Sequence, residues 1–234
     1  MSGRARTVLI LTGATGLVGR AVARRLAGTE RTLVLAARRP ATLEALVADL
    51  GPEARAHPVV CDVTRPPQVE ALMDTARTLG TVAQWVHATG LEVAGDLDQG
   101  SVEAWREMLE VNLLSAATVG RAFAAACGRR GGTAVWIGSR RSSWASPGDA
   151  VYAASKAALS SLAASFRAEP FAARLRLTLL EPAVVAEGRG AVLRPDDVAA
   201  AVAWLLDLPR AVEVTLLRLR HPGDRRPRPP RPRA

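Results

Sequence analysis

Lysine and tyrosine are almost missing from this chain of 234 residues. Of its 31 basic residues 30 are arginine, which leaves Lys156 as the one lysine, and Tyr152 is the one tyrosine. Cysteine is also scarce: Cys61 and Cys127 are too few for a disulfide framework, which favours a reducing compartment and predicts a cytoplasmic protein. A hydrophobic content of 49% excludes a wholly disordered chain and suffices for the core of one domain.

Membrane spans and metal sites are not indicated either. No run of about 20 apolar residues is free of charge and glycine, so we expect no transmembrane segment. The three histidines and the two cysteines are dispersed without the spacing of metal ligands, so we also expect no metal site.

The excess of positive charge is concentrated at the C-terminus. The formal net charge is +9, but five arginines lie in the last ten residues, and without them 26 basic residues face 22 acidic ones. The high isoelectric point therefore gives little support for nucleic-acid binding. Because the Pro- and Arg-rich end can form neither a helix nor a strand ladder, we expect one domain over residues 1–223 and a disordered tail over 224–234.

Between the ends, short β-branched or leucine-rich runs alternate with alanine- and leucine-rich stretches of helical period. We expect strands at Thr7–Leu11, Thr32–Ala36, Arg55–Val60, Val82–His87, Thr133–Ile137, Leu175–Leu180 and Val212–Leu219. We expect helices at Val18–Leu26, Leu43–Leu50, Pro67–Leu79, Val102–Ala126, Val151–Phe166 and Pro195–Leu206. Apolar strands separated by helices indicate a parallel sheet covered on both faces. This predicts an α/β fold, a Rossmann-like doubly wound sheet of about seven strands that binds ligands beyond the carboxyl ends of its strands.

The first expected strand runs into a glycine-rich turn, TGATGLVG, and then into a helix. Gly13, Gly16 and Gly19 would allow a tight turn and a close approach of the backbone to a pyrophosphate, which a helix N-terminus attracts. An ordinary glycine-rich turn is the alternative. The position of the motif at the start of an alternating chain favours dinucleotide binding.

The tip of the second strand indicates which dinucleotide to expect. NAD-binding folds commonly carry an acidic residue there, whereas this chain has Arg38 and Arg39. Guanidinium groups would pair with the 2′-phosphate of NADP, which predicts NADP(H) rather than NAD(H); two solvated arginines are the alternative. Asp62, after the third strand, could accept a hydrogen bond from the adenine amino group or cap the next helix.

The two rare residues lie four positions apart near the start of an expected helix. Tyr152 and Lys156 therefore share one helix face, and an ammonium near a phenol favours the phenolate, which predicts a lowered pKa for Tyr152. Such a tyrosine could give a proton to a carbonyl oxygen or take one from an alcohol. Ser139, at the end of the fifth strand, could hold the same substrate oxygen.

With these residues the chain resembles the short-chain dehydrogenases/reductases from its start to about His221. The spacing of Ser139, Tyr152 and Lys156 is similar to the family pattern S-x12-Y-x3-K. The resemblance implies that Tyr152 is the general acid/base, that Ser139 orients the substrate oxygen, and that Lys156 binds the nicotinamide ribose and tunes the tyrosine. It also implies that Asn112 supports a water-linked proton relay. The cofactor-binding residues implied are Gly13, Thr15, Gly16, Leu17, Gly19, Arg38, Arg39, Asp62, Val63, Ala88, Thr89, Gly90, Tyr152, Lys156, Pro182, Val184 and Val185.

Three segments depart from the main single-domain branch of that family. Leu17 stands where this branch has its middle glycine, and the spacing TGxxGxxG is that of extended and atypical members. The segment HATG replaces Asn-Asn-Ala-Gly, and we expect its His87 to be structural or bonded to the backbone rather than a general base. Pro182-Ala183 replaces Pro-Gly, and the few residues before Pro195 predict a shortened substrate lid.

These features predict an NADP(H)-dependent oxidoreductase that moves a hydride between the nicotinamide and a carbonyl or secondary alcohol of a small molecule. A non-redox enzyme of the same fold, such as an epimerase, dehydratase or cyclase, is one alternative. A dinucleotide-binding regulatory protein is another, although the intact Ser139, Tyr152 and Lys156 argue against it because a sensor needs no acid/base.

Two further expectations concern the substrate and the assembly. Arg140, Arg141 and Trp144 follow Ser139 and could bind a carboxylate, a phosphate or a pantetheine arm, with a solvated loop as the favoured alternative. The helix expected from Val102 carries more apolar positions than one sheet-facing stripe needs, and family members often pair this helix across a two-fold axis, so we expect a homodimer or homotetramer. These positions are Trp105, Met108, Leu109, Val111 and Leu113.

Overall fold

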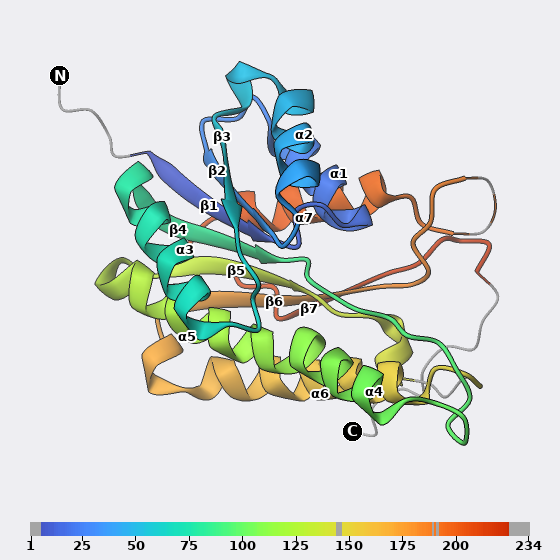
Figure 1. Cartoon of the computed structure of the whole chain (residues 1–234). Helices are drawn as coiled ribbons and strands as arrows, with labels where there is room; N and C mark the ends of the chain where they lie inside the picture. The colour runs from blue at the N-terminus through green and yellow to red at the C-terminus, as the bar shows by residue number, and fades with distance from the viewer. Residues whose placement is uncertain (1–5, 144–146, 189, 191, 225–234) are drawn as a thin grey trace, which may run out of the picture.

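The computed structural model describes residues 6–143, 147–188, 190 and 192–224 and has three layers, with one parallel sheet between two layers of helices (Figure 1). The seven strands follow the order β3-β2-β1-β4-β5-β6-β7, which confirms the predicted doubly wound sheet. They are β1 (Thr7–Thr12), β2 (Thr32–Ala37), β3 (Ala56–Val60), β4 (Thr81–His87), β5 (Gly132–Ile137), β6 (Leu175–Pro182) and β7 (Leu216–Leu219). The α-helices are α1 (Leu17–Leu26), α2 (Pro40–Leu50), α3 (Pro66–Leu79), α4 (Val102–Leu109), α5 (Ser115–Cys127), α6 (Ala150–Ala168) and α7 (Pro195–Asp207).

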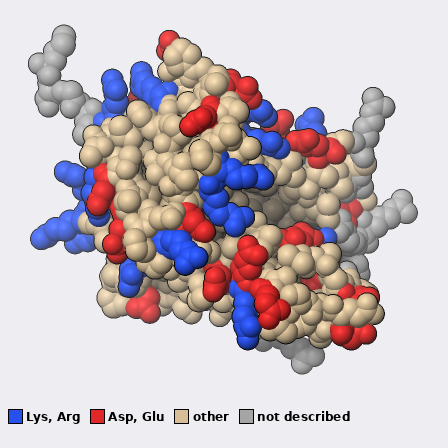
Figure 2. All heavy atoms as spheres, in the orientation of Figure 1, with Lys and Arg blue, Asp and Glu red and all other residues tan. Residues whose placement is uncertain are grey.

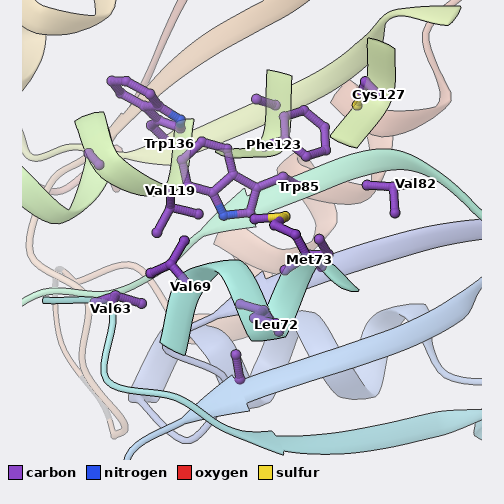
Figure 3. Close-up of a cluster of buried hydrophobic side chains, with 14 of the residues drawn as sticks. Val63, Val69, Leu72, Met73, Val82, Trp85, Val119, Phe123, Cys127 and Trp136 are labelled. Atoms are coloured by element: carbon purple, nitrogen blue, oxygen red, sulfur yellow. The ribbon is translucent and has the colours of Figure 1, made fainter. Parts of the chain in front are cut away.

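The two faces of the sheet bury separate cores because successive strand side chains point to opposite sides. In β1, Val8 and Ile10 join a core covered by α3, α5 and α6, whereas Leu9 and Leu11 join one covered by α1, α2 and α7. The first core is built around aromatic rings, with Trp85 5.7 Å from both Phe123 and Trp136 between ring centroids (Figure 3). Burial on both faces explains why the strands read as continuous apolar runs.

The helix expected over Val102–Ala126 is interrupted in its middle. A π-helical turn, η2 (Glu110–Leu114), separates α4 from α5 and holds Asn112. Apolar periodicity does not show such a turn, because one extra residue changes the register without ending the helix. The apolar helical run Val102–Arg130 is, within the described part of the chain, the one segment long and apolar enough to cross a membrane; half of its most apolar window is buried inside the protein.

The last strand is shorter than the predicted Val212–Leu219. The residues before Leu216 are joined to β6 by individual hydrogen bonds that involve side chains. Thr178 Oγ1 donates to the carbonyl oxygen of Val214 at 2.5 Å, and the Leu177 amide donates to Glu213 Oε1 at 3.1 Å. A regular ladder therefore starts only at Leu216. Apart from Asp224, which is buried, the predicted tail lies outside the described residues.

Basic and acidic side chains are interspersed on the face seen in Figure 2. Neither sign forms a continuous patch there.

Candidate active site

A cleft runs along the carboxyl ends of the central strands, where the strand order reverses between β1 and β4. It consists of two adjoining hollows of about 310 and 540 Å³ that share Gly16, Ala88, Thr89 and Gly90 in their walls. We call the first the substrate hollow and the second the adenosine hollow. Every predicted cofactor-binding residue except Gly19 lines one of them.

The glycine-rich turn fits closely between β1 and β4. Gly13 has a φ of +77°, and a Cβ atom there would lie 2.6 Å from the carbonyl carbon of Ala88. A Cβ on Gly19 would collide with the carbonyl oxygen of Gly13, so this glycine serves the packing of α1 on the turn. A side chain at either position would therefore force the backbone of the turn to move.

The same region contains polar groups that the described residues do not satisfy and that a ligand could bind. The N-terminus of α1 has no side-chain cap and no acidic residue in its first turn, which leaves a partial positive charge toward the cleft. The hydroxyl of Thr89, which lines both hollows, is buried and has no partner within the described residues. An anionic dinucleotide with hydroxyl groups would match both features.

Arg38, Arg39, Asp62 and Val63 lie together in the adenosine hollow, as expected. Arg38 is not isolated: its guanidinium lies 3.6 Å from the carboxylate of Glu107 on α4, and both side chains are more than half exposed. Such an exposed pair is weak, so a phosphate could displace Glu107.

Asp62 does not cap α3, whose first turn is preceded by Arg65. Its Oδ1 accepts instead from the amide (3.0 Å) and the hydroxyl (2.8 Å) of Thr64. Partial burial raises the pKa of Asp62, but these bonds and the nearby Arg38 and Arg65 outweigh it and hold the pKa below its usual value. The carboxylate therefore stays ionised beside the hollow.

The structure brings Ser139, Tyr152 and Lys156 together in the wall of the substrate hollow. Tyr152 belongs to the first turn of α6, and the Lys156 ammonium lies 5.8 Å from the centre of its ring. Lys156 is buried and donates to the carbonyl oxygen of Ile137 at 3.2 Å, at the tip of β5. Ser139, just beyond that tip, accepts from the Arg141 amide at 3.2 Å, and its hydroxyl acts to lower the pKa of Tyr152.

The predicted lowering of the Tyr152 pKa is wrong for this structure. Burial raises the pKa of Tyr152, the charge of Glu92 raises it further, and the opposing effects of Ser139 and Arg141 do not compensate. Burial also lowers the pKa of Lys156 to about 8. Desolvation is thus the largest effect on Tyr152, and its phenol is neutral at neutral pH.

Asn112 lies behind the cleft and fastens one of its walls. Its Oδ1 accepts from the Leu91 amide at 2.7 Å, and its Nδ2 donates to the Leu91 carbonyl oxygen at 2.8 Å and to Ser155 Oγ at 3.0 Å. Ser155 Oγ in turn donates to the carbonyl oxygen of Tyr152 at 2.7 Å. Both hydrogens of the Asn112 amide are used, so the expected proton relay would have to involve its backbone rather than its side chain.

Arg141 lines the substrate hollow, and its guanidinium is bound by two carboxylates. Its NH1 atom lies 2.6 Å from Glu92 Oε1 and 2.9 Å from Asp149 Oδ1. Arg140 is buried, and Trp144 lies outside the described residues. No sequence pattern revealed Glu92 or Asp149, because the ion pairs join three separate loops.

His87 lies completely buried beside the glycine-rich turn. Its Nδ1 is 2.9 Å from Thr12 Oγ1 and its Nε2 is 3.4 Å from Ser115 Oγ, while Trp85 Nε1 donates to Thr12 Oγ1 at 3.2 Å. Burial lowers the pKa of His87 to about 3, so the ring is neutral. His87 is structural, as expected, although its partners are side chains rather than the backbone.

The segment over the substrate hollow is short. Val185 and Leu193 form a β-bridge, and two backbone hydrogen bonds join residues 184 and 186 to Leu193 at 2.9 and 3.0 Å. None of the described residues between Pro182 and Pro195 is helical. The described part of the predicted lid therefore adds no helix beside the substrate hollow.

Comparison with known proteins agrees with this geometry. The family profile described as short chain dehydrogenase matches residues 7–196. The chain belongs to the short-chain dehydrogenase/reductase family. It is 30% identical over 179 residues to sulfoacetaldehyde reductase 2 of Chromohalobacter salexigens, covering 75% of this chain and 71% of that protein. It is 27% identical over 242 residues to an NADP-dependent 3-hydroxy acid dehydrogenase of Salmonella typhimurium, covering 91% and 94%.

The fold matches a solved member of this family closely. An alcohol dehydrogenase from the archaeon Thermococcus sibiricus, in complex with 5-hydroxy-NADP, superposes with a TM-score of 0.87 at 31% identity. The match covers 95% of this chain and 99% of that one. The protein therefore belongs to a family of oxidoreductases that use a nicotinamide cofactor and small-molecule substrates.

Proposed function

We propose that the protein is an NADP(H)-dependent oxidoreductase that transfers a hydride between the nicotinamide and a carbonyl or secondary alcohol carbon. The observation that carries the proposal is the convergence of the Tyr152 phenol, the Ser139 hydroxyl and the Lys156 ammonium on one open hollow at the strand tips. An acid/base, a hydrogen-bonding group and a buried cation are what the transfer of a proton to a carbonyl oxygen needs.

The roles of the three residues follow from their surroundings. Ser139 and Tyr152 would hold the substrate oxygen, and the neutral phenol of Tyr152 would donate its proton to it during reduction. Lys156 uses one of its hydrogens on Ile137, which leaves two for the nicotinamide ribose, and its charge would stabilise the phenolate left on Tyr152. The cofactor, when bound, supplies or accepts the hydride.

The preference for NADP(H) over NAD(H) rests on the adenosine hollow. Arg38 and Arg39 both line it, and the acidic residue nearest to Arg38 is an exposed partner that a phosphate could replace. Two similar proteins carry NADP in their descriptions, the 3-hydroxy acid dehydrogenase and the Thermococcus sibiricus alcohol dehydrogenase complex. Both similarities, at 27% and 31% identity, support this choice.

A panel of aldehydes and ketones, with NADPH and NADH in parallel, tests the proposal. We expect loss of reduced-cofactor absorbance with at least one carbonyl compound, faster with NADPH, and transfer of deuterium from labelled NADPH to the product. Deuterium in the product separates net redox from an epimerase, dehydratase or cyclase. Tight NADPH binding with no turnover of any compound would favour the regulatory alternative.

We also propose that the enzyme is a cytoplasmic homodimer or homotetramer. Both cysteines are buried and free, in keeping with a reducing compartment. On the long helix, Met108 and Val111 are buried within the chain, but Val102, Leu109 and Leu114 are 46%, 37% and 57% exposed. Apolar groups left exposed along one helix favour a partner surface.

A further inference from the structure

Glu92 and Arg141 line the substrate hollow beside Tyr152 and lie together with Asp149, and the proposed reaction does not require these three charged side chains. Glu92 and Asp149 both bind the guanidinium of Arg141, at 2.6 and 2.9 Å, and that guanidinium lies 5.6 Å from the centre of the Tyr152 ring. Two carboxylates share one cation, so this acid–arginine cluster (Glu92, Arg141 and Asp149) has an excess of one negative charge.

The cluster is held in place by the same contacts that build the site. Glu92 follows Leu91, whose amide and carbonyl are both bound by Asn112. The backbone amide of Arg141 donates to Ser139, and the Asp149 carbonyl accepts from Ala153 in the first turn of α6. The charges therefore keep a fixed position relative to the reacting groups.

Within the cluster, Glu92 is the member that a substrate would meet. It lines the substrate hollow and its side chain is 46% exposed, whereas Asp149 is 12% exposed and does not line the hollow. The negative charge of Glu92 already acts on both Tyr152 and Lys156, because it raises the pKa of each.

The cations that line the substrate hollow, Arg140, Arg141 and Lys156, all have partners in the protein. Arg141 is bound by two carboxylates, and Arg140 is buried and has interactions of its own. Lys156 points to the backbone of Ile137 and, in the proposed function, serves the cofactor. A carboxylate, sulfonate or phosphate on the substrate would approach Glu92, whose one cation, Arg141, is shared with Asp149, so the acid–arginine cluster as a whole would repel it.

We propose that Glu92 makes this enzyme select carbonyl substrates that are uncharged or cationic near the reacting carbon and discriminate against anionic ones. The proposal rests on the proposed reductase function and adds the charge class of its substrate. A positive group, such as an ammonium next to the carbonyl, would gain an ion pair with the carboxylate oxygen of Glu92 that Arg141 does not use.

Three small ketones of similar size test the charge preference: methyl pyruvate (neutral), pyruvate (anionic) and aminoacetone (cationic). For each we compare kcat/KM with NADPH between the wild type and Glu92→Gln, because intrinsic carbonyl reactivity cancels in this ratio. A ketone that is not reduced is measured as a competitive inhibitor of the best carbonyl compound from the panel. Relative to methyl pyruvate, we expect Glu92→Gln to improve pyruvate by about tenfold and to weaken aminoacetone by a similar factor.

Two further variants make the result specific. Glu92→Asp keeps the charge and should keep the wild-type order of the three ketones. Glu103→Gln removes an acid of α4 that is 80% exposed and contacts Arg106 and the Ser101 hydroxyl, so it should leave all three values unchanged. An equal loss for all three ketones in Glu92→Gln would mean a purely structural role and would overturn the proposal, as would unchanged ratios. Absence of any NADPH-dependent turnover in the wild type would instead refute the proposed function.

Discussion

The ammonium of Lys156 lies 5.8 Å from the centre of the Tyr152 ring, and neither residue type occurs anywhere else in the chain. The single asparagine, Asn112, fastens the loop that faces them. In a protein that otherwise uses arginine for its positive charges, a buried lysine is a specific choice. An ammonium is compact and its pKa falls on burial, here to about 8, whereas a guanidinium is wider and stays charged.

Replacement of this lysine by arginine should therefore not be conservative. Lys156→Arg keeps the charge but puts a planar, five-donor group into a site that is 4% exposed and built around the Ile137 carbonyl. We expect kcat to fall by at least about a hundredfold. Steady-state kinetics together with NADPH binding by fluorescence measure the effect, and near-normal turnover would show that any cation suffices.

The cofactor preference should depend on Arg38 and on its neighbour. Arg38→Ala removes the proposed 2′-phosphate partner, so we expect NADPH to bind at least about tenfold more weakly while NADH is unaffected. Glu107→Gln removes a carboxylate that competes for Arg38 and should strengthen NADPH binding by about two- to fivefold. Titration calorimetry with both cofactors measures this. Equal effects on NADPH and NADH would show that Arg38 is only a surface charge.

His87 should make the fold sensitive to mild acid. The unfolded chain binds a proton at this residue below about pH 6.5, whereas the folded protein does so only below about pH 3. The unfolded state thus binds more protons between these values, and stability falls as the pH drops. Between pH 7.5 and pH 5 the loss from His87 should be about 2 kcal/mol. Urea unfolding of the wild type and His87→Gln measures it: the variant should lose less stability over this interval, and equal losses would exclude His87 as the cause.

The proposed assembly has a simple test. Light scattering should give at least twice the chain mass of 24.7 kDa. Leu114→Glu places a charge on the exposed apolar side of the long helix and should lower that mass, whereas Val60→Glu, on the edge strand β3, should not. A wild-type mass equal to one chain would contradict the proposal.

The parts of the fold and site that follow local patterns were predictable from the sequence. The strands were identifiable because burial on both faces makes them apolar throughout, as in TLVLAA of β2. Tyr152 and Lys156 were identifiable because a spacing of four residues fixes their relation on a helix. Ser139 was identifiable through its spacing along the sequence from these two residues.

What was not predictable depends on contacts between distant segments. Glu92, Arg141 and Asp149 meet because three loops converge at the strand tips, and no spacing along the chain reports this. The direction of the Tyr152 pKa shift was predicted wrongly for a related reason. A helix face shows that an ammonium is near, but only the packed structure shows how far burial and two carboxylates oppose it.

Replacement of Tyr152 by phenylalanine tests the central claim most directly, because it removes one oxygen atom and keeps the ring. Turnover of the best carbonyl substrate from the panel and the dissociation constant of NADPH are measured for the wild type and Tyr152→Phe. We predict a loss of kcat of about a thousandfold or more with NADPH binding changed by less than about threefold. Turnover close to that of the wild type would contradict the assignment of Tyr152 as the general acid/base.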